Sequence, residues 1–293
     1  MRTVEVVIPV YNPDDRIYTI IKRLLKQSLK PDRINIILTV SDKFDEDDLK
    51  KGFIKNNIDD LSVTVTTIEK SAFNHGGTRQ AAAEKCRAEL CLFMTQDAMP
   101  LDKNLLNNLA REFDNGEIAV CYARQLPYKN AALREKFARN FNYPPEPMIK
   151  DISMLNAGKI KAIFCSDVCA MYNMEIFREL DGFERNVDFN EDMLYAHKTL
   201  TNGYLVSYCA AALIYHSHNL SLKEQFRRNR EIARSQKSHP DVFDSLSSES
   251  EGIAYLVSGI KYIVKRGQII EAFRFIADCG SRFIGYRIGK LFK

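Results

Sequence analysis

The stretch "VEVVIPV" (Val4–Val10) reads as a short β-strand that is apolar on both faces. Three later runs have the same character: "INIILTV" (Ile34–Val40), "LSVTVTTI" (Leu61–Ile68) and "LCLFM" (Leu90–Met94). Strands that are buried on both faces belong to parallel sheets. Helical patterns separate these runs, at about residues 17–30, 45–56 and 78–87. The alternation predicts a βαβαβαβ unit, a right-handed, doubly wound α/β fold.

In a sheet of this kind, ligands bind beyond the carboxyl ends of the strands. Four segments leave those ends, and each carries polar or glycine-rich chemistry: "PVYNPDD", "SDKFDED", "EKSAFNHGGTR" and "TQDAMP". The opposite ends of the strands carry mainly turn residues such as "KPDR". The functional site is therefore predicted at the carboxyl edge of the sheet.

The chain has 293 residues with 45% apolar composition, enough for one large domain, or a domain plus an appendage, without disulfides. Its seven cysteines are an odd number and lie mostly in apolar segments. This usage is typical of reduced thiols that pack as small hydrophobes. We see no signal-peptide pattern and no apolar run near the roughly 20 residues that a bilayer span needs. We therefore expect a cytoplasmic protein.

The basic charge of the chain lies at its end. Residues 253–293 carry eight lysines and arginines against two acidic residues, whereas the first 252 residues have a net charge of −2. Apolar residues recur at helical intervals on both sides of Gly267, which predicts two amphipathic helices with cationic flanks. This basic tail either packs as a helical appendage or docks on an anionic membrane surface. Long basic stripes interleaved with aromatic residues are absent elsewhere, so we expect no nucleic-acid partner.

The segment "HGGTR" (His75–Arg79) opens a helix after the third predicted strand. Free backbone N–H groups at such a helix start, together with Arg79, suit a diphosphate. A cation opposes the helix dipole at this position, so Arg79 needs another reason to be there. The two glycines also fit an ordinary tight turn, and that alternative stays open.

One aspartate and two histidines form a candidate metal site. Asp97 follows the fourth predicted strand, and His216 and His218 close the β-rich run "LVSYCAAALIYHSH". Alternation along a strand puts the two histidines on one face. An aspartate and a histidine, with diphosphate oxygens and water in the other positions, suit Mg²⁺ or Mn²⁺. Histidines hydrogen-bonded at a strand end are the alternative.

Two acids begin another predicted helix in "NEDMLYAHKTL", where Glu191 and Asp192 lie in the first turn. Acids there stabilise the helix dipole without any catalysis, or one of them is a general base that faces the crevice. "CSDVC" (Cys165–Cys169) lacks a second cysteine pair, so we expect core packing rather than a metal site. The arginines of "QFRRNREIAR" are expected on a solvated helix face or as a phosphate clamp.

Together, "VVIPVYN", "HGGTRQAA", "FMTQDAMP", "NEDMLYA" and "AALIYHSHN" resemble the family 2 inverting glycosyltransferases, in particular their bacterial rhamnosyltransferase-like branch. "RQLP", "FNYP" and "CSDVCAMYN" also resemble the midsection of this branch. The resemblance implies a GT-A fold, with a mostly parallel doubly wound sheet and a C-terminal helical appendage. It implies a glycosyltransferase domain in residues 1–245, in which residues 1–100 bind the nucleotide-sugar and residues 101–245 the acceptor. Residues 246–293 then form the basic tail.

The resemblance also implies roles for single residues. The Asp-x-Asp motif of the family falls on Thr95, Gln96 and Asp97, so only the second carboxylate is present to hold the divalent ion. His216 completes this metal site, with His218 as a further candidate, and Asp192 of the Glu191–Asp192 pair is the catalytic base. The donor is implied to contact Pro9, Tyr11, Asn12, Asp42, His75, Gly76, Arg79, Gln96 and Asp97. The acceptor is implied to contact Asn142, Tyr143 and Phe183.

The resulting hypothesis is an enzyme that transfers L-rhamnose from dTDP-L-rhamnose to a saccharide hydroxyl, with inversion at the anomeric carbon. The acceptor is expected to be carried on a lipid diphosphate, in the synthesis of a cell-surface polysaccharide. Residues 253–293 would then contact the inner face of the plasma membrane. Two alternatives remain. A noncatalytic nucleotide-sugar-binding homologue would explain the missing first aspartate, whereas a sugar nucleotidyltransferase normally has a glycine- and arginine-rich loop where this chain has "YNPDD".

Overall fold

The computed structural model describes residues 2–247 and 249–291. Within these residues, nine strands form one sheet. They are β1 (Val4–Tyr11), β2 (Arg33–Thr39), β3 (Val63–Ile68), β4 (Leu90–Met94), β5 (Met99–Pro100), β6 (Ile118–Leu126), β7 (Met148–Lys150), β8 (Cys169–Asn173) and β9 (Leu205–Tyr215).

The helices of the described chain alternate with these strands and then continue alone to the C-terminal end. They are α1 (Arg16–Leu25), α2 (Glu46–Lys55), α3 (His75–Lys85), α4 (Leu105–Glu112), α5 (Leu133–Asn142), α6 (Ile152–Asn156), α7 (Met174–Glu179), α8 (Glu191–Thr201), α9 (Leu222–Lys237), α10 (Pro240–Phe243), α11 (Glu249–Val264) and α12 (Ile269–Leu291). Short 3₁₀ turns cover Lys70–Ala72 and Ile160–Ala162.

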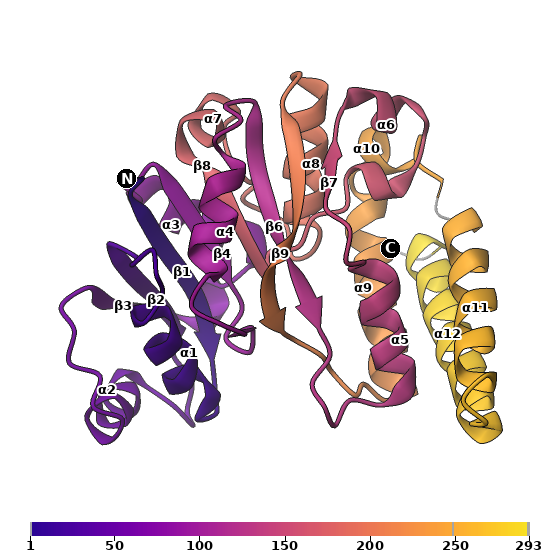
Figure 1. Cartoon of the computed structure of the whole chain (residues 1–293), viewed down its shortest axis with the longest axis horizontal. Helices are drawn as coiled ribbons and strands as arrows, with labels where there is room; N and C mark the ends of the chain where they lie inside the picture. Colours follow the sequence, from indigo (N-terminus) through magenta and orange to yellow (C-terminus); the bar gives the residue numbers. More distant parts are fainter. Residues whose placement is uncertain (1, 248, 292–293) are drawn as a thin grey trace. The chain divides into compact units, whose positions relative to one another are not determined.

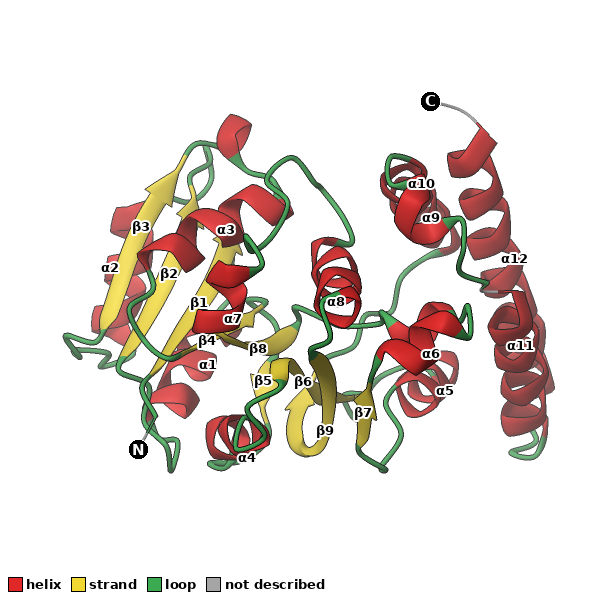
Figure 2. Ribbon diagram, turned by 90° about the horizontal axis from the view of Figure 1, so that it is seen from above, coloured by secondary structure: helices red, strands yellow, loops and turns green. Residues whose placement is uncertain are grey.

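Four parallel strands lie in the order β3-β2-β1-β4, with β1 inside the sheet. Val6, Ile8 and Leu92 on these strands are 0% exposed, as expected for strands covered on both faces. The chain moves outward from β1 to β3 and then returns to β4, so right-handed crossovers place α3 on the opposite face from α1 and α2. Figure 2 shows this arrangement. The predicted βαβαβαβ pattern is confirmed.

Beyond β4 the sheet becomes antiparallel. β8 pairs with β4 and with β6, and β9 pairs with β5 and with β7. An apolar run looks the same in either kind of strand when both of its faces are buried, so the sequence pattern does not show this change. The α/β fold class is confirmed, and each of the seven cysteines is free, in agreement with the expected thiols.

The described residues form two compact units. One comprises the residues up to 124, 145–152 and 163–215, and it contains most of the sheet. The other comprises residues 125–144, 153–162 and those from 216 onward, and it is mainly helical. The boundary near residue 245 that the sequence suggests stays a prediction.

In the helical unit, α12 packs along α9, and α11 packs against α5 and α12 (Figure 1). Phe137 of α5, Ile263 of α11 and Phe275 of α12 share one apolar core, in which Ile263 and Phe275 are 0% exposed. Gly267, with a left-handed φ of 71°, lies in the turn between α11 and α12. The two predicted tail helices are confirmed, and they pack on α5 and α9 as an appendage.

α12 approaches α9 most closely at two glycines. A Cβ atom added at Gly285 would lie 2.4 Å from the carbonyl oxygen of Phe226, and one at Gly289 would lie 2.3 Å from that of Arg230. Side chains at these positions would collide with the backbone of α9. The absence of a side chain therefore lets the two helices touch.

We expect Gly285→Ala to lower the melting temperature, because the added methyl group forces α12 away from α9 at a cost of about 1–3 kcal/mol. Gly280→Ala is the matched control, since a Cβ atom there meets nothing within 4 Å. Alanine at position 280 should stabilise α12 by about 0.5–1 kcal/mol. Thermal unfolding followed by circular dichroism measures both variants, and effects of the same sign and size would contradict the close approach.

Candidate active site

The carboxyl ends of β1, β2 and β4 are joined by side chains at one edge of the sheet. The N–H of Tyr11 donates to Gln96 Oε1 at 2.8 Å, and Gln96 Nε2 donates to the carbonyl of Tyr11 at 3.1 Å. The Ser41 hydroxyl donates to Asn12 Oδ1, and Asn12 has a left-handed φ of 43°. Pro9 lies in β1 just before them. These predicted donor contacts therefore converge at the expected edge.

The start of α3 lies against the loop that precedes α8. Gly76 N–H donates to the carbonyl of Val187 at 2.9 Å, and a Cβ atom on Gly76 would lie 2.1 Å from the carbonyl oxygen of Glu184. Gly77 N–H donates to Asn74 Oδ1 at 2.6 Å. These N–H groups, which the sequence led us to expect free for a diphosphate, are engaged within the protein. The close approach of the neighbouring backbone requires glycine at position 76.

Arg79 lies in the core, with 3% of its surface exposed. Its Nη1 lies 3.0 Å from Glu191 Oε1 and 3.1 Å from His75 Nδ1, and its Nε lies 3.3 Å from Asp167 Oδ2. Asp167 also accepts the Tyr172 hydroxyl at 2.6 Å. A buried cation needs such partners, because an unpaired charge in the interior is very costly. The predicted contacts of His75 and Arg79 with a donor diphosphate stay predictions.

Three carboxyl groups surround this one guanidinium. Asp192 Oδ2 accepts the Asp167 N–H at 3.1 Å, and Oδ1 accepts the Met193 N–H at 2.8 Å. Burial, and then the charge of Glu191, raise the pKa of Asp192 to about 7. Burial also raises the pKa values of Asp167 and Glu191, against the opposing charge of Arg79. The group therefore carries fewer than three negative charges near neutral pH.

The guanidinium itself stays charged. Burial acts to lower the pKa of Arg79, but the charges of Glu191, Asp167 and Asp192 outweigh it and raise the pKa. The guanidinium therefore keeps its positive charge over the pH range in which the neighbouring carboxyl groups gain or lose protons. Its presence limits how far their pKa values rise.

Asp192 is the least buried residue of this ion cluster. Asp167 and Glu191 are only 3% and 6% exposed, whereas Asp192 keeps partial access to solvent. It lies in the first turn of α8, after Asn190, whose φ of 69° is left-handed. A carboxylate whose pKa is near 7 is well matched to general-base work at neutral pH. Of the two predicted catalytic acids, Glu191 pairs with Arg79, and the role of Asp192 as the base stays a prediction.

His216 is held in one tautomer. Its Nδ1 lies 2.9 Å from Gln125 Oε1, and the Arg139 guanidinium, which can only donate, donates to the same oxygen. The Gln125 oxygen is therefore the acceptor, and His216 Nδ1 carries the proton. Nε2 of the neutral ring keeps its lone pair and lies 3.0 Å from Nε2 of His218. A fixed tautomer of this kind is typical of metal-binding histidines.

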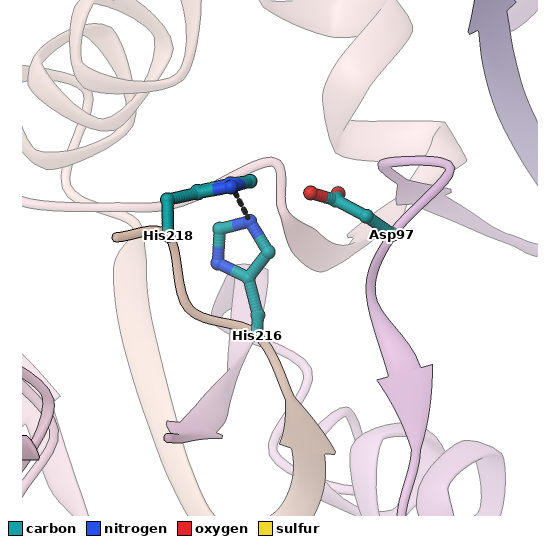
Figure 3. Close-up of side chains that lie close together, drawn as sticks. All are labelled: Asp97, His216 and His218. Atoms are coloured by element: carbon teal, nitrogen blue, oxygen red, sulfur yellow. Dashed lines mark hydrogen bonds between the residues drawn. The ribbon is translucent and has the colours of Figure 1, made fainter. Parts of the chain in front are cut away.

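Asp97 is placed by strand pairing near the end of β9. β5 pairs with β9 so that Met99 lies opposite Tyr215, and His216 follows Tyr215 directly. The ligand atoms of Asp97, His216 and His218 lie within 4.8 Å of one another, and Figure 3 shows these side chains facing each other. One carboxylate and two imidazoles suit a divalent ion such as Mn²⁺. The predicted metal ligands are thus brought together.

The predicted acceptor contacts differ in their surroundings. Asn142 is exposed at the end of α5, whereas Tyr143 is 5% exposed, with the Arg139 guanidinium 6.0 Å from its ring centroid. Phe183 is 2% exposed and packs edge-to-face on Phe93 at 5.4 Å. The Phe183 side chain is therefore part of the core. The roles of these residues toward an acceptor stay predictions.

Two residues of the site are not predicted from the sequence. Asp167 lies inside "CSDVC", where the cysteines dominate the pattern, although an acid in an apolar run is itself a signal of a buried partner. Gln125 lies in "RQLP", and a single glutamine gives no signal that it would hold a metal-binding histidine in place.

Asp42, a predicted donor contact, is exposed in the turn after β2.

Comparison with known proteins gives consistent matches. The family model described as glycosyl transferase family 2 matches residues 5–181. The O-antigen chain rhamnosyltransferase RfbN of Salmonella typhimurium is 32% identical over 289 residues, which cover 98% of this chain and 89% of that protein. The O-antigen chain rhamnosyltransferase WbaN of Salmonella anatum is 31% identical over 267 residues, which cover 90% of this chain and 82% of that protein.

Solved structures share the fold. The mannosyltransferase PcManGT from Pyrobaculum calidifontis, in complex with GDP-Man and Mn²⁺, matches with a TM-score of 0.67 at 11% identity, over 99% of this chain and 87% of that one. Residues 1–349 of S. aureus TarS, in complex with UDP-GlcNAc, match with a TM-score of 0.55 at 15% identity, over 98% and 90%. These likenesses confirm the GT-A-like architecture.

We expect Asp192→Asn to stabilise the protein at alkaline pH. A carboxyl whose pKa is about 7 in the folded protein, against 3.8 ordinarily, binds its proton more tightly in the folded state. The protonated carboxyl therefore makes its whole contribution to the free energy of unfolding below about pH 4. This contribution is lost as the pH rises through about 7. Asparagine mimics the protonated form and avoids this loss. At pH 8 the gain should be on the order of 1–2 kcal/mol, allowing for the solvent access of Asp192, with a smaller gain at pH 5.

Urea unfolding of the wild type and the variant at pH 5 and pH 8 measures this difference. Asp188→Asn is the matched control, because Asp188 is exposed in the loop before α8, and it should change stability little at either pH. An equal effect of Asp192→Asn at both pH values would mean that folding does not perturb the ionisation of Asp192.

Proposed function

The chain belongs to glycosyl transferase family 2 and is a glycosyltransferase, and from this premise we propose that it transfers L-rhamnose from dTDP-L-rhamnose to a saccharide hydroxyl. The support for this donor is the identity of 31–32% with two O-antigen chain rhamnosyltransferases over 90–98% of the chain. The acceptor in this proposal is a growing cell-surface saccharide, carried on a lipid diphosphate at the cytoplasmic face of the membrane.

The observation that carries the reaction is the carboxyl of Asp192, which belongs to the least buried residue of the ion cluster and has a pKa of about 7. Asp192 accepts the proton of the acceptor hydroxyl while that oxygen attacks the anomeric carbon. The bond to the diphosphate oxygen breaks with its electron pair on the leaving group, and attack from the opposite face inverts the configuration. The pKa near 7 leaves Asp192 ionised enough to act at neutral pH and basic enough to hold the proton. Glu191 and Asp167, which pair with Arg79, position this residue.

A divalent cation fits the Asp97, His216 and His218 group. The lone pair of His216 Nε2 is oriented by Gln125, and all three ligand atoms lie within 4.8 Å of one another. PcManGT, which shares the fold, is described with Mn²⁺. Bound here, Mg²⁺ or Mn²⁺ would neutralise charge on the leaving diphosphate. Hydrogen-bonded histidines without metal are the competing interpretation.

The nucleotide half of the donor is proposed at the joined ends of β1 and β2. Tyr11 is 40% exposed there, and its ring offers a face to a base. Lys70 Nζ lies 5.4 Å from the centroid of this ring. Thr95 Oγ1 is buried and finds no hydrogen-bond partner among the described residues, so it is available to a donor hydroxyl.

Family membership favours glycosyl transfer over the two alternatives raised by the sequence. A nucleotidyltransferase would form a diphosphate and would not need a base aimed at a saccharide hydroxyl. A noncatalytic homologue would bind the nucleotide-sugar without turnover. A variant that loses turnover but still binds the donor would show that the protein catalyses the transfer and does not only bind the nucleotide-sugar.

We expect Asp192→Asn to lower kcat by about 10²- to 10⁴-fold while dTDP-L-rhamnose still binds, because only the proton acceptor is removed. Release of dTDP from dTDP-L-rhamnose, with a lipid-linked saccharide acceptor, measures turnover. For the wild type, kcat/KM should rise with pH through an apparent pKa near 7. Asp188→Asn is the control and should retain wild-type turnover. Unchanged turnover in Asp192→Asn would remove Asp192 from the role of base.

We expect Asp97→Asn and His216→Ala to weaken Mn²⁺ binding at least tenfold, because each removes one ligand. Free Mn²⁺, followed by electron paramagnetic resonance in the presence of dTDP, measures the affinity. His239→Ala is the control, because this histidine precedes α10 outside the cluster. If all variants bind Mn²⁺ like the wild type, or the enzyme is fully active in excess chelator, the metal assignment is wrong.

A further inference from the structure

The large apolar side chains that are open to solvent gather on the last two helices. Ten of the seventeen such residues in the described chain lie there, although these helices make up only about a seventh of it. They form what we call the outer apolar face: Ile253, Val257 and Val264 of α11, and Ile269, Ile270, Phe273, Ile276, Phe283, Ile284 and Leu291 of α12. Ile270 and Phe273 are 73% and 69% exposed. A concentration of this kind marks an interaction site.

The spacing along α12 explains why this face stays open. Ile269, Phe273, Ile276 and Ile284 recur at helical intervals on one side. The other side, which includes Phe275, packs on α11 and α9. The helix is therefore apolar on both sides, whereas a surface helix of a globular protein usually has a polar outer side. Packing within the described part of the helical unit leaves the outer side of α12 without a partner.

The charges beside this face are mostly positive. The two acids of α12 are already paired: Glu271 with Arg134 at 2.8 Å and Asp278 with Arg282 at 2.7 Å. By contrast, four cations of the two helices and their turn have no acidic partner among the described residues: Lys261, Lys265, Arg266 and Arg287. The face is thus bordered by uncompensated positive charge.

A hollow of about 500 Å³ lies at the turn between the two helices. Arg134, Arg266, Arg274 and Glu271 line it, so that three guanidinium groups face one carboxylate. Arg266 is held in place there, since its Nη1 donates to the carbonyl of Tyr262 at 2.9 Å and its guanidinium stacks 3.6 Å from the Tyr262 ring centroid. Guanidinium groups are well suited to phosphate oxygens.

We propose that the α11–α12 pair docks the protein on an anionic membrane surface. The outer apolar face enters the boundary between headgroups and acyl chains, and the arginine-lined hollow holds a lipid phosphate. None of the described helices is long and apolar enough to cross a membrane, so α11 and α12 lie along its surface. The unpaired cations favour an anionic membrane over a second copy of the chain. Two such faces in contact would bring like charges together. The proposal does not depend on the donor, the acceptor or the base.

Co-sedimentation of the full-length protein with vesicles tests the proposal. We expect binding to vesicles of 70% phosphatidylcholine and 30% phosphatidylglycerol, and at least tenfold weaker binding to phosphatidylcholine alone or at 0.5 M salt. The double variant Ile270→Ser/Phe273→Ser should bind at least tenfold more weakly, as should Arg266→Gln/Arg274→Gln. Ile54→Ser is the matched control, because Ile54 is 78% exposed on α2, far along the chain from the tail, and it should bind like the wild type. Equal melting temperatures would verify that the variants fold.

Binding that is unaffected by either double variant would overturn the assignment of this surface. Absence of binding to anionic vesicles would overturn the proposal as a whole. Sedimentation velocity without lipid then identifies the other occupant: a dimer that Ile270→Ser/Phe273→Ser dissociates would make the outer apolar face an interface between two copies of the chain.

Discussion

One buried guanidinium, that of Arg79, constrains three segments that are far apart in the sequence. Its partners come from the segment before β8 (Asp167) and the first turn of α8 (Glu191), while Arg79 itself belongs to α3. Leaving one of these charges unpaired in the interior would cost several kcal/mol, so the chain can reach a stable fold only by bringing all three together. The position of Asp192 follows, because it is the neighbour of Glu191 in the same turn and accepts the Asp167 N–H.

The apolar core supports the ion cluster through the same segments. The Tyr172 hydroxyl donates to Asp167, and its ring lies 5.6 Å from that of Phe93 and 5.2 Å from that of Phe183. Phe183 N–H donates to Gln80 Oε1, and Gln80 follows Arg79 in α3. Polar and apolar contacts thus hold the same turn of the same helix. Such support would keep Asp192 within the narrow range of positions that its proposed role as a general base requires.

The sequence predicts those features that depend on local periodicity. The strands from β1 to β4, the helix that starts with Glu191 and the two tail helices all follow from apolar spacing, and the structure confirms them. Features that depend on partners distant in the sequence are harder to predict from the sequence. The pattern "HGGTR" puts Arg79 at a helix start, but only the fold reveals that it meets Asp167 and Glu191 inside the protein. Periodicity likewise predicts α12 without showing that its apolar residues form two opposite faces, one packed and one open.

The charge of the proposed metal site offers a reason why "TQDA" carries a single carboxylate, Asp97, where the family motif has two. With Thr95 in place of a first aspartate, the proposed ligand group consists of one carboxylate, from Asp97, and two imidazoles. A divalent ion held by this group keeps a net charge of about +1, whereas two carboxylates would cancel its charge. The remaining positive charge favours a diphosphate, since the anion is attracted to the site as a whole. In this proposal His216 and His218 would supply ligand atoms without reducing that attraction, and the Gln125–Arg139 pair holds the His216 tautomer that this requires.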